Sequence, residues 1–246
     1  MFKRFVSGLV IAVAFMSPSF ADEVDDLLAY YVKRFTPETA HITVSGKPDS
    51  TGAFSDVWLD LRGIVIDKLR MDSLKVRMKG VQFNKPSEWA KGKVECSDAI
   101  SVQAVAEILE ADINRAIENR TFGHGEDKWH DLSLAIRTSG LSGRGYYNAG
   151  ASFLNLDILI EIVSGLKIVK GKELWLNDPQ VKVNKLDLPD YLTKKALSRI
   201  QPLVDLRKFP LPLTLHKVEL SNGRATLRTR TLPKALTQGL KYNYTR

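Results

Sequence analysis

This chain has almost no cysteine, and that absence excludes two ways of holding a fold together. Its 246 residues include one cysteine, Cys96, so neither a disulfide framework nor a thiolate zinc cluster can form within the chain. A chain of this length buries about 70% of the surface that it exposes when unfolded, so its core needs no such support. We expect Cys96 to be a small buried apolar residue rather than a reactive thiol.

Catalytic motifs are lacking too. The sequence contains no phosphate-binding glycine loop and no H-E-x-x-H, and Ser142 stands one residue out of register for a G-x-S-x-G elbow. The loop 123–131 contains His124, Glu126 and His130 at a spacing that fits no zinc motif, so we interpret it as a solvated connection between a helix and a strand. We expect no enzyme activity, no cofactor and no metal. A hydrolase that uses these three residues is the opposing hypothesis.

Long apolar runs are lacking after residue 21, where no stretch reaches the 18 residues of a membrane-spanning helix. The first 21 residues have a basic start at Lys3 and Arg4, an apolar run over 5–16 and small residues at Ser19 and Ala21. This pattern predicts a signal peptide that is cleaved after Ala21, because an uncleaved anchor would need roughly 20 apolar residues. We expect an exported, soluble protein of the periplasm or cell envelope.

Three segments of the remaining chain have helical spacing. The first is an amphipathic helix over 22–35, with acids in its first turn and bases in its last. A second helix is expected to begin at Ser101 and to run to about Ile117. A third covers 189–207, where Pro202 should kink or interrupt it.

Most other residues alternate between apolar and polar, as in strands with one buried and one solvated face. Strands are expected within 40–84, at 94–96, 132–136, 154–162, 166–168, 174–176 and 181–188, and in a hairpin over 211–227 that turns at 221–223. A glycine-rich turn is expected over 140–145, and the residues after Pro233 show no clear periodicity. The predicted fold class is α+β: a long curved antiparallel sheet wrapped around two or three amphipathic helices, with no linker that divides it.

Positive charge is concentrated late in the chain. Residues 22–123 hold 14 bases against 17 acids, whereas 124–246 hold 20 bases against 11 acids. Such a region can attract an anionic membrane surface, a polyanionic glycolipid or nucleic acid, and export argues against nucleic acid. A basic face that only keeps the protein soluble would have the same composition. The residues expected to meet a head group or membrane surface are Arg207, Lys208, Arg224 and Arg228.

The one-sided strands create a wide apolar face, which few helices have to cover. An incompletely covered face can hold an apolar ligand. Each methylene moved out of water contributes about 0.8 kcal/mol, so a 16-carbon acyl chain could contribute on the order of 12 kcal/mol before ordering costs. A closed core would produce the same pattern. The side chains expected to contact the acyl chain are Leu74, Val76 and Met78, opposite Leu154, Leu156, Ile158, Ile160 and Ile162.

Several segments resemble one known family. They are 44–84, 94–98 leading to Ser101, the run Ile200–Pro212 with the pattern I-x-P-L-x-D-L-x-x-x-P, and 218–227. Over about residues 40–230 the chain resembles the LmeA family of exported bacterial phospholipid-binding proteins. The resemblance implies a lipid-binding fold similar to tubular lipid-binding domains, and a role in envelope lipid or glycolipid metabolism. It assigns no ligand residue.

Together these observations give one expected organisation. Residues 1–21 are a signal peptide, 22–38 an N-terminal amphipathic helix, 39–232 the LmeA-like lipid-binding domain and 233–246 a basic C-terminal tail. We expect the protein to bind phospholipid or another acyl lipid, to contact anionic membranes peripherally, and to maintain or transfer envelope lipids without catalysis. The alternative is a structural or scaffold module of the envelope with a closed core, whose basic face docks on polyanions or partner proteins.

Overall fold

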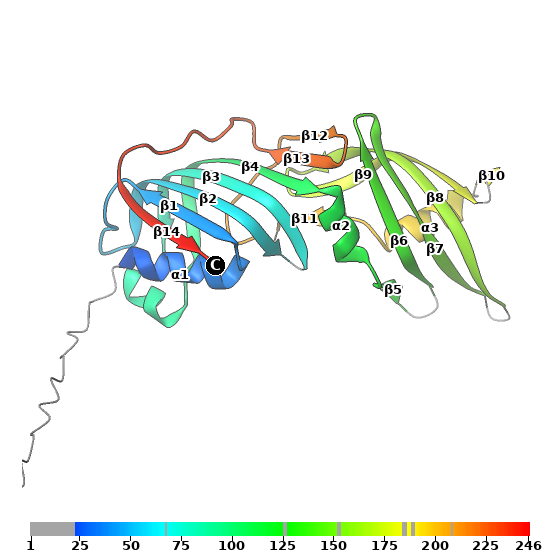
Figure 1. Ribbon diagram of the computed structural model, residues 1–246, viewed down its shortest axis with the longest axis horizontal. Helices are drawn as coiled ribbons and strands as arrows, with labels where there is room; N and C mark the ends of the chain where they lie inside the picture. The colour runs from blue at the N-terminus through cyan, green and yellow to red at the C-terminus, as the bar shows by residue number, and fades with distance from the viewer. Residues whose placement is uncertain are drawn as a thin grey trace, which may run out of the picture.

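The computed structural model describes residues 23–246 except 67, 125–126, 152–153, 184–185, 188–189 and 208. Most of these residues lie in two curved antiparallel sheets that follow one another along the long axis of the molecule (Figure 1). The predicted signal peptide therefore falls outside the described residues. Within them, no helix is both long and apolar enough to cross a bilayer.

The first sheet has seven strands in the order β12-β13-β4-β3-β2-β1-β14. Their bounds are β1 Thr39–Val44, β2 Ala53–Ile66, β3 Leu69–Phe83, β4 Cys96–Leu109, β12 Lys217–Ser221, β13 Arg224–Arg228 and β14 Leu240–Thr245. Val57 of β2 pairs with Met78 of β3, and two residues further along Leu59 pairs with Val76. Because side chains alternate between the faces of a strand, these pairs point together into the core.

The second sheet follows the order β10-β9-β8-β7-β6-β5, and a short strand β11 pairs with β9. Its strands are β5 Phe122–His124, β6 Asp127–Arg137, β7 Gly140–Ala151, β8 Leu154–Val169, β9 Glu173–Val183, β10 Leu186–Asp187 and β11 Val204–Asp205. All of these pairs are antiparallel. Each sheet is thus mainly a meander of neighbouring strands, which agrees with the predicted antiparallel, broadly α+β class. The strands form two sheets with separate cores, however, and not the one long sheet wrapped around helices that the sequence predicts.

Helix α1 (Glu23–Phe35) covers the concave side of the first sheet (Figure 1). Its fully buried residues Val24, Leu27, Tyr31 and Phe35 recur every three or four positions, which places them on one helix face. A short 3-10 helix, η1 (Pro86–Lys91), packs against α1 and buries Trp89. The helix predicted over 22–35 is confirmed over its described residues.

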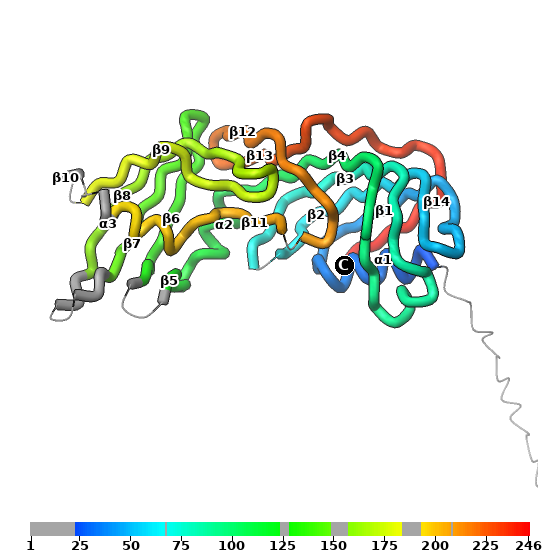
Figure 2. Tube along the Cα trace, turned by 180° about the vertical axis from the view of Figure 1, so that it is seen from behind, coloured from blue at the N-terminus to red at the C-terminus, as the bar shows by residue number. Residues whose placement is uncertain are grey.

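Two further helices belong to the second half of the molecule. Helix α2 (Glu110–Ile117) joins β4 to the second sheet, and α3 (Asp190–Ser198) packs against that sheet through Ala196 and Leu197. The buried indole of Trp129 donates a hydrogen bond of 2.8 Å to the Ala196 carbonyl. Two hydrophobic cores result, one under each sheet, and Figure 2 shows the chain after α3 running from the second sheet back toward the first.

The helix predicted from Ser101 to Ile117 is wrong over its first half. Residues up to Leu109 form β4, and α2 begins at Glu110. Val102, Val105 and Leu109 have helical spacing, whereas Val102, Ala104 and Ala106 alternate, so the apolar pattern alone does not decide between helix and strand. Pairing with β3, which joins Ser101 to Lys79 and Ala106 to Leu74, favours the strand.

Three other expectations also need correction. The third helix ends at Ser198 rather than at Arg207, before Pro202, and residues 204–205 form β11. The glycines at 140–145 lie within β7 instead of forming a turn. The tail 233–246 contains β14, which pairs with β1 along its whole length.

Cys96 is the first residue of β4 and is half-buried with a free thiol. Burial, together with the nearby Asp98 carboxylate, raises the pKa of the thiol to about 11. The thiol therefore stays protonated at neutral pH, as expected for an unreactive cysteine.

Candidate functional site

A cavity of about 360 Å³ lies where the two sheets meet. This volume falls in the range of roughly 300–1,000 Å³ that is typical of small-molecule sites. Its wall is formed by β3, β4 and β13 of the first sheet, by β6 to β9 of the second, by α2 and by the chain after α3. The apolar residues of the wall are Leu69, Ile108, Ile113, Ile117, Phe122, Leu132, Leu134, Ile136, Leu141, Ile162, Leu166, Leu174, Leu176, Ile200, Pro202, Leu203, Val204, Ala225 and Leu227.

Gly143 accounts for part of the open space. On β7 the inward positions include Leu141, Gly143 and Tyr147, and Gly143 lies beside Leu134 of β6. A Cβ atom built on Gly143 would have one neighbour within 4 Å, the Ser133 carbonyl oxygen at 3.5 Å. The missing side chain therefore leaves the cavity wider at this point of the wall.

The polar groups of the wall are few and lie on the side of the second sheet. They are contributed by Ser133, Arg144, Arg199 and Gln201, and none of the described lining residues is acidic. Arg144 follows the inward-facing Gly143, so alternation directs its exposed guanidinium to the outer face of β7. Arg199 is half-buried with its Nε atom inaccessible to solvent, which makes it the cation of the described wall best placed for an anionic group.

A second cation lies beside the cavity. The Arg120 guanidinium stacks over the Phe122 ring, which lines the cavity, with its central carbon 5.3 Å from the ring centroid. Its Nη1 atom also donates a hydrogen bond to the Ala116 carbonyl. An apolar wall flanked by arginines favours an amphiphile with an anionic head group.

A smaller apolar void of about 30 Å³ lies next to this cavity, under the first sheet. Three residues, Ile108, Val204 and Leu227, line both spaces. The other walls of the void include Leu74, Ala104 and the chain around Leu213. The two spaces therefore adjoin at these three shared side chains.

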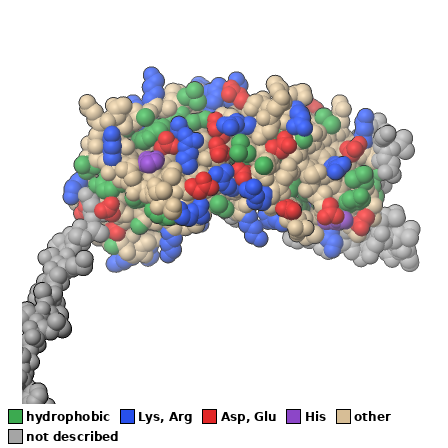
Figure 3. Space-filling view, in the orientation of Figure 1, with side chains coloured by type: hydrophobic (Ala, Val, Ile, Leu, Met, Phe, Trp, Pro, Cys, Tyr) green, Lys and Arg blue, Asp and Glu red, His purple; other side chains and the backbone are tan. Residues whose placement is uncertain are grey.

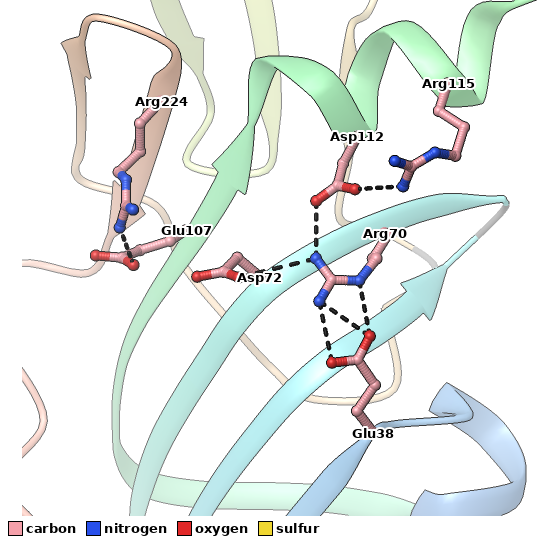
Figure 4. Close-up of polar contacts among 7 residues, drawn as sticks. All are labelled: Glu38, Arg70, Asp72, Glu107, Asp112, Arg115 and Arg224. Carbon is pink, nitrogen blue, oxygen red and sulfur yellow. Dashed lines mark hydrogen bonds and ion pairs between the residues drawn. The ribbon is translucent and has the colours of Figure 1, made fainter. Parts of the chain in front are cut away.

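An ion-pair network fixes α2, which forms one wall of the cavity. Asp112 of α2 is buried and accepts hydrogen bonds of 2.9 Å from both Arg70 and Arg115 (Figure 4). The Arg70 guanidinium also bridges to Glu38, with its Nε atom 3.1 Å from Oε1, and lies 3.8 Å from Asp72. Because a buried carboxylate is costly without partners, this network holds α2 against β3.

The structure separates the predicted acyl-contact residues into two cores. Leu74, Val76 and Met78 point into the core under the first sheet, whereas Ile160 and Ile162 belong to the core under the second. The two groups therefore do not face one another. Of the eight predicted residues, Ile162 lines the large cavity and Leu74 lines the small void. Ile158 is half-buried beside the second core. The side chains of Leu154 and Leu156 lie outside the described residues.

The basic residues predicted to meet a head group face carboxylates. Arg207 lies 2.6 Å from Asp205 and 3.0 Å from Glu173. Arg224 pairs with Glu107 (Figure 4), and Arg228 lies 3.3 Å from Glu219. Lys208 is outside the described residues. Figure 3 shows Lys and Arg mixed with Asp and Glu across the viewed face, so the positive charge here is more dispersed than the sequence implies.

The histidines of loop 123–131 do not contact the cavity where they are described. Strands β5 and β6 form a hairpin here, so the loop joins two strands rather than a helix and a strand. His130 follows the buried Trp129 and so faces the outer side of β6, between Asp131 at 3.0 Å and Asp157 at 3.2 Å. Glu126 and the His124 side chain lie outside the described part. Among the described residues no group of three or more His, Cys, Asp or Glu could hold a metal ion.

Sequence reasoning missed most of the cavity wall. The missed residues include Gly143 and Arg199, and also Ile113 and Ile117 of α2. The last two lie within the helix expected up to Ile117, but the sequence did not indicate what they face. A glycine at an inward position of an apolar strand could have signalled open space. The wall joins residues from 69 to 227, so its composition depends on how the two sheets meet.

The fold and the cavity define a two-sheet protein that can enclose an apolar ligand between its halves. Residues 9–230 match the family model described as LmeA-like phospholipid-binding. The chain belongs to this phospholipid-binding family, as its resemblance predicts. The search of curated proteins and the search of solved structures each gave no match.

Proposed function

We propose that this protein binds a phospholipid in the cavity between its sheets and acts, after export, in the maintenance or transfer of envelope lipids without catalysing a reaction. The observation that carries the proposal is the nearly continuous apolar wall of the 360 Å³ cavity. Membership of a phospholipid-binding family supports the ligand class. Export rests on the signal-peptide pattern of residues 1–21.

The wall suits the two parts of a phospholipid. Its apolar surface removes acyl methylenes from water, each contributing about 0.8 kcal/mol. Arg199 offers a guanidinium to the phosphate, and the absence of acidic groups among the described lining residues avoids repulsion of an anion. A protein that only shields an acyl chain from water needs no nucleophile and no metal. We therefore propose a binding role without catalysis.

The test is lipid uptake by the whole protein and by two variants of β7. Gly143→Leu fills the cavity, whereas the matched control Ser142→Leu places the same side chain on the outer face beside the exposed Val163. After incubation with phosphatidylglycerol vesicles, native mass spectrometry should show a lipid adduct for the wild type and the control. Gly143→Leu should lose roughly tenfold or more in affinity, because several methylenes are displaced.

Three outcomes would count against the proposal. Repeated wild-type preparations with no lipid and no uptake would overturn it. Salt-sensitive binding to polyanions by such lipid-free protein would favour the scaffold alternative, which the nine bases after position 206 could support. A change in the mass of the extracted lipid would contradict a role without catalysis.

A further inference from the structure

We infer that a bound phospholipid points its acyl end toward the first sheet, where Ile108, Val204 and Leu227 set the chain length that the cavity accepts. The inference rests on the proposed function and adds to it an orientation and a specificity determinant. Its basis is the small void next to the main cavity and the uneven distribution of polar groups between the two spaces.

The polar end of the binding space lies beside the second sheet. Arg199 and Gln201 follow α3, which packs on that sheet through Ala196 and Leu197. Arg199 is half-buried, lines the cavity and has an Nε atom that is inaccessible to solvent, so part of its guanidinium lies at the inner wall. A phosphate is therefore best placed at this end, where a charge-assisted hydrogen bond can form.

The opposite end offers nothing to a phosphate. The void is lined by apolar side chains, by Arg228 at the end of β13 and by Thr229, which follows it. Arg228 alternates with the buried Leu227 and Thr229, so its guanidinium faces outward, where it pairs with Glu219. The Thr229 hydroxyl donates to the Thr231 carbonyl and accepts from the Ala104 N–H. The remaining lining side chains of the void are apolar and therefore suit the terminal methyl group of an acyl chain.

The three shared residues come from elements that are fixed in place. Ile108 and Leu227 lie on the paired strands β4 and β13 and are 3% and 5% exposed. Val204 faces them from β11, where it pairs with Leu174 of β9. The neighbouring Leu203 N–H donates a hydrogen bond of 2.8 Å to the carbonyl oxygen of Leu174. Ile108, Val204 and Leu227 together form a constriction between the cavity and the void. Because strand pairing holds all three positions, this constriction should limit the acyl length at a fixed point instead of opening and closing.

The size of the void determines what this limit does. About 30 Å³ leaves little room beyond the constriction, so a chain that reaches it must stop or displace side chains. A lipid binds about fourfold more weakly for each methylene that stays in water instead of entering the apolar space. The cavity should therefore select lipids by acyl length.

The test uses vesicles that contain a series of phosphatidylglycerols differing only in acyl length, with the bound species read by native mass spectrometry. Ala106→Leu fills the void and should shift the bound population to shorter chains, by about fourfold in affinity per excluded methylene. Ile108→Val removes one methyl from the constriction and should shift it to longer chains. Val105→Leu, at the neighbouring outward position of β4, should leave the distribution unchanged.

A variant at the polar end of the cavity distinguishes the placement of the head group from the selection of acyl-chain length. Arg199→Gln should weaken binding of all chain lengths equally, because it removes the cation at the polar end and leaves the apolar wall unchanged. Opposite shifts from Ala106→Leu and Ile108→Val cannot both arise from a general loss of stability. An unchanged length distribution in lipid-loaded Ala106→Leu and Ile108→Val overturns this inference alone, whereas a wild type without lipid overturns the proposed function itself.

Discussion

His130 lies between two carboxylates on the outer face of the second sheet. Its Nδ1 atom is 3.0 Å from Asp131 and its Nε2 atom 3.2 Å from Asp157, and its ring stacks on Tyr146. The hydrogen bond to Asp131, followed by that to Asp157, raises the pKa of the imidazole above 6.5. Protonated His130 therefore links β6 to β8 across β7.

This geometry predicts a pH-dependent contribution to stability. Since the folded-state pKa is raised, the contribution is fully present below pH 6.5 and is lost as pH rises through the folded pKa. Relative to His130→Asn, the wild type should be more stable by at most about 1 kcal/mol at low pH, because the pair is partly exposed. Urea unfolding on both sides of pH 6.5 measures this difference.

A titration of the His130 ring protons by NMR provides the control. Asp157→Asn should move the pKa of His130 back toward 6.5, because one of its two partners is lost. A wild-type pKa at or below 6.5 would contradict the assignment.

At the scale of elements, β14 gives a structural role to a segment that looked like a basic tail. It pairs with β1 from Leu240 to Thr245, and the Arg246 N–H continues the ladder by donating to the Glu38 carbonyl at 3.0 Å. N–H groups two residues apart point the same way in a strand, so the Tyr244 N–H also faces β1. Strand β14 thereby covers the edge that β1 would otherwise expose.

A proline at position 244 should break this pairing. Tyr244→Pro removes a ladder donor and a ring that packs on the first core, so the free energy of unfolding should fall by about 2 kcal/mol or more. Thr245→Pro is the matched control, because the Thr245 N–H points away from β1 by the same alternation. Chemical denaturation of both variants gives the comparison, and equal losses would mean that the ladder at Tyr244 contributes nothing.

At the scale of the whole molecule, the binding space lies between two cores rather than within one. Each sheet buries its own inward face, and the cavity wall combines residues of both. A ligand in this position contacts both halves of the folded protein, and the unfolded chain offers no such site. Binding should therefore stabilise the fold by linkage.

Removal of lipid should accordingly lower the thermal stability. At free ligand about 100 times the dissociation constant, binding contributes about 2.7 kcal/mol. The melting temperature of the delipidated wild type should rise when phosphatidylglycerol is returned. The melting temperature of Gly143→Leu should stay nearly constant under the same treatment, and an unchanged wild-type melting temperature would show that lipid does not bind in the folded state.

The sequence by itself determined the antiparallel strands, the first helix and the family. Alternation at Val57, Leu59, Val76 and Met78 follows from local chemistry, because one buried and one solvated face require it. The spacing of the buried residues of α1 is local in the same way. These features could be predicted without knowing what each face packs against.

Only the tertiary structure decided the partners of those faces. Residues 101–109 fit a helix or a strand until the edge of β3 is available to pair with them. Arg207, Arg224 and Arg228 form a basic cluster in the sequence, whereas folding brings Glu173, Glu107 and Glu219 to them. The cavity arises in the same way, because Ile108, Val204 and Leu227 are distant in the chain and meet only where the two sheets adjoin. Periodicity fixes which way a side chain points, and long-range packing fixes what it meets.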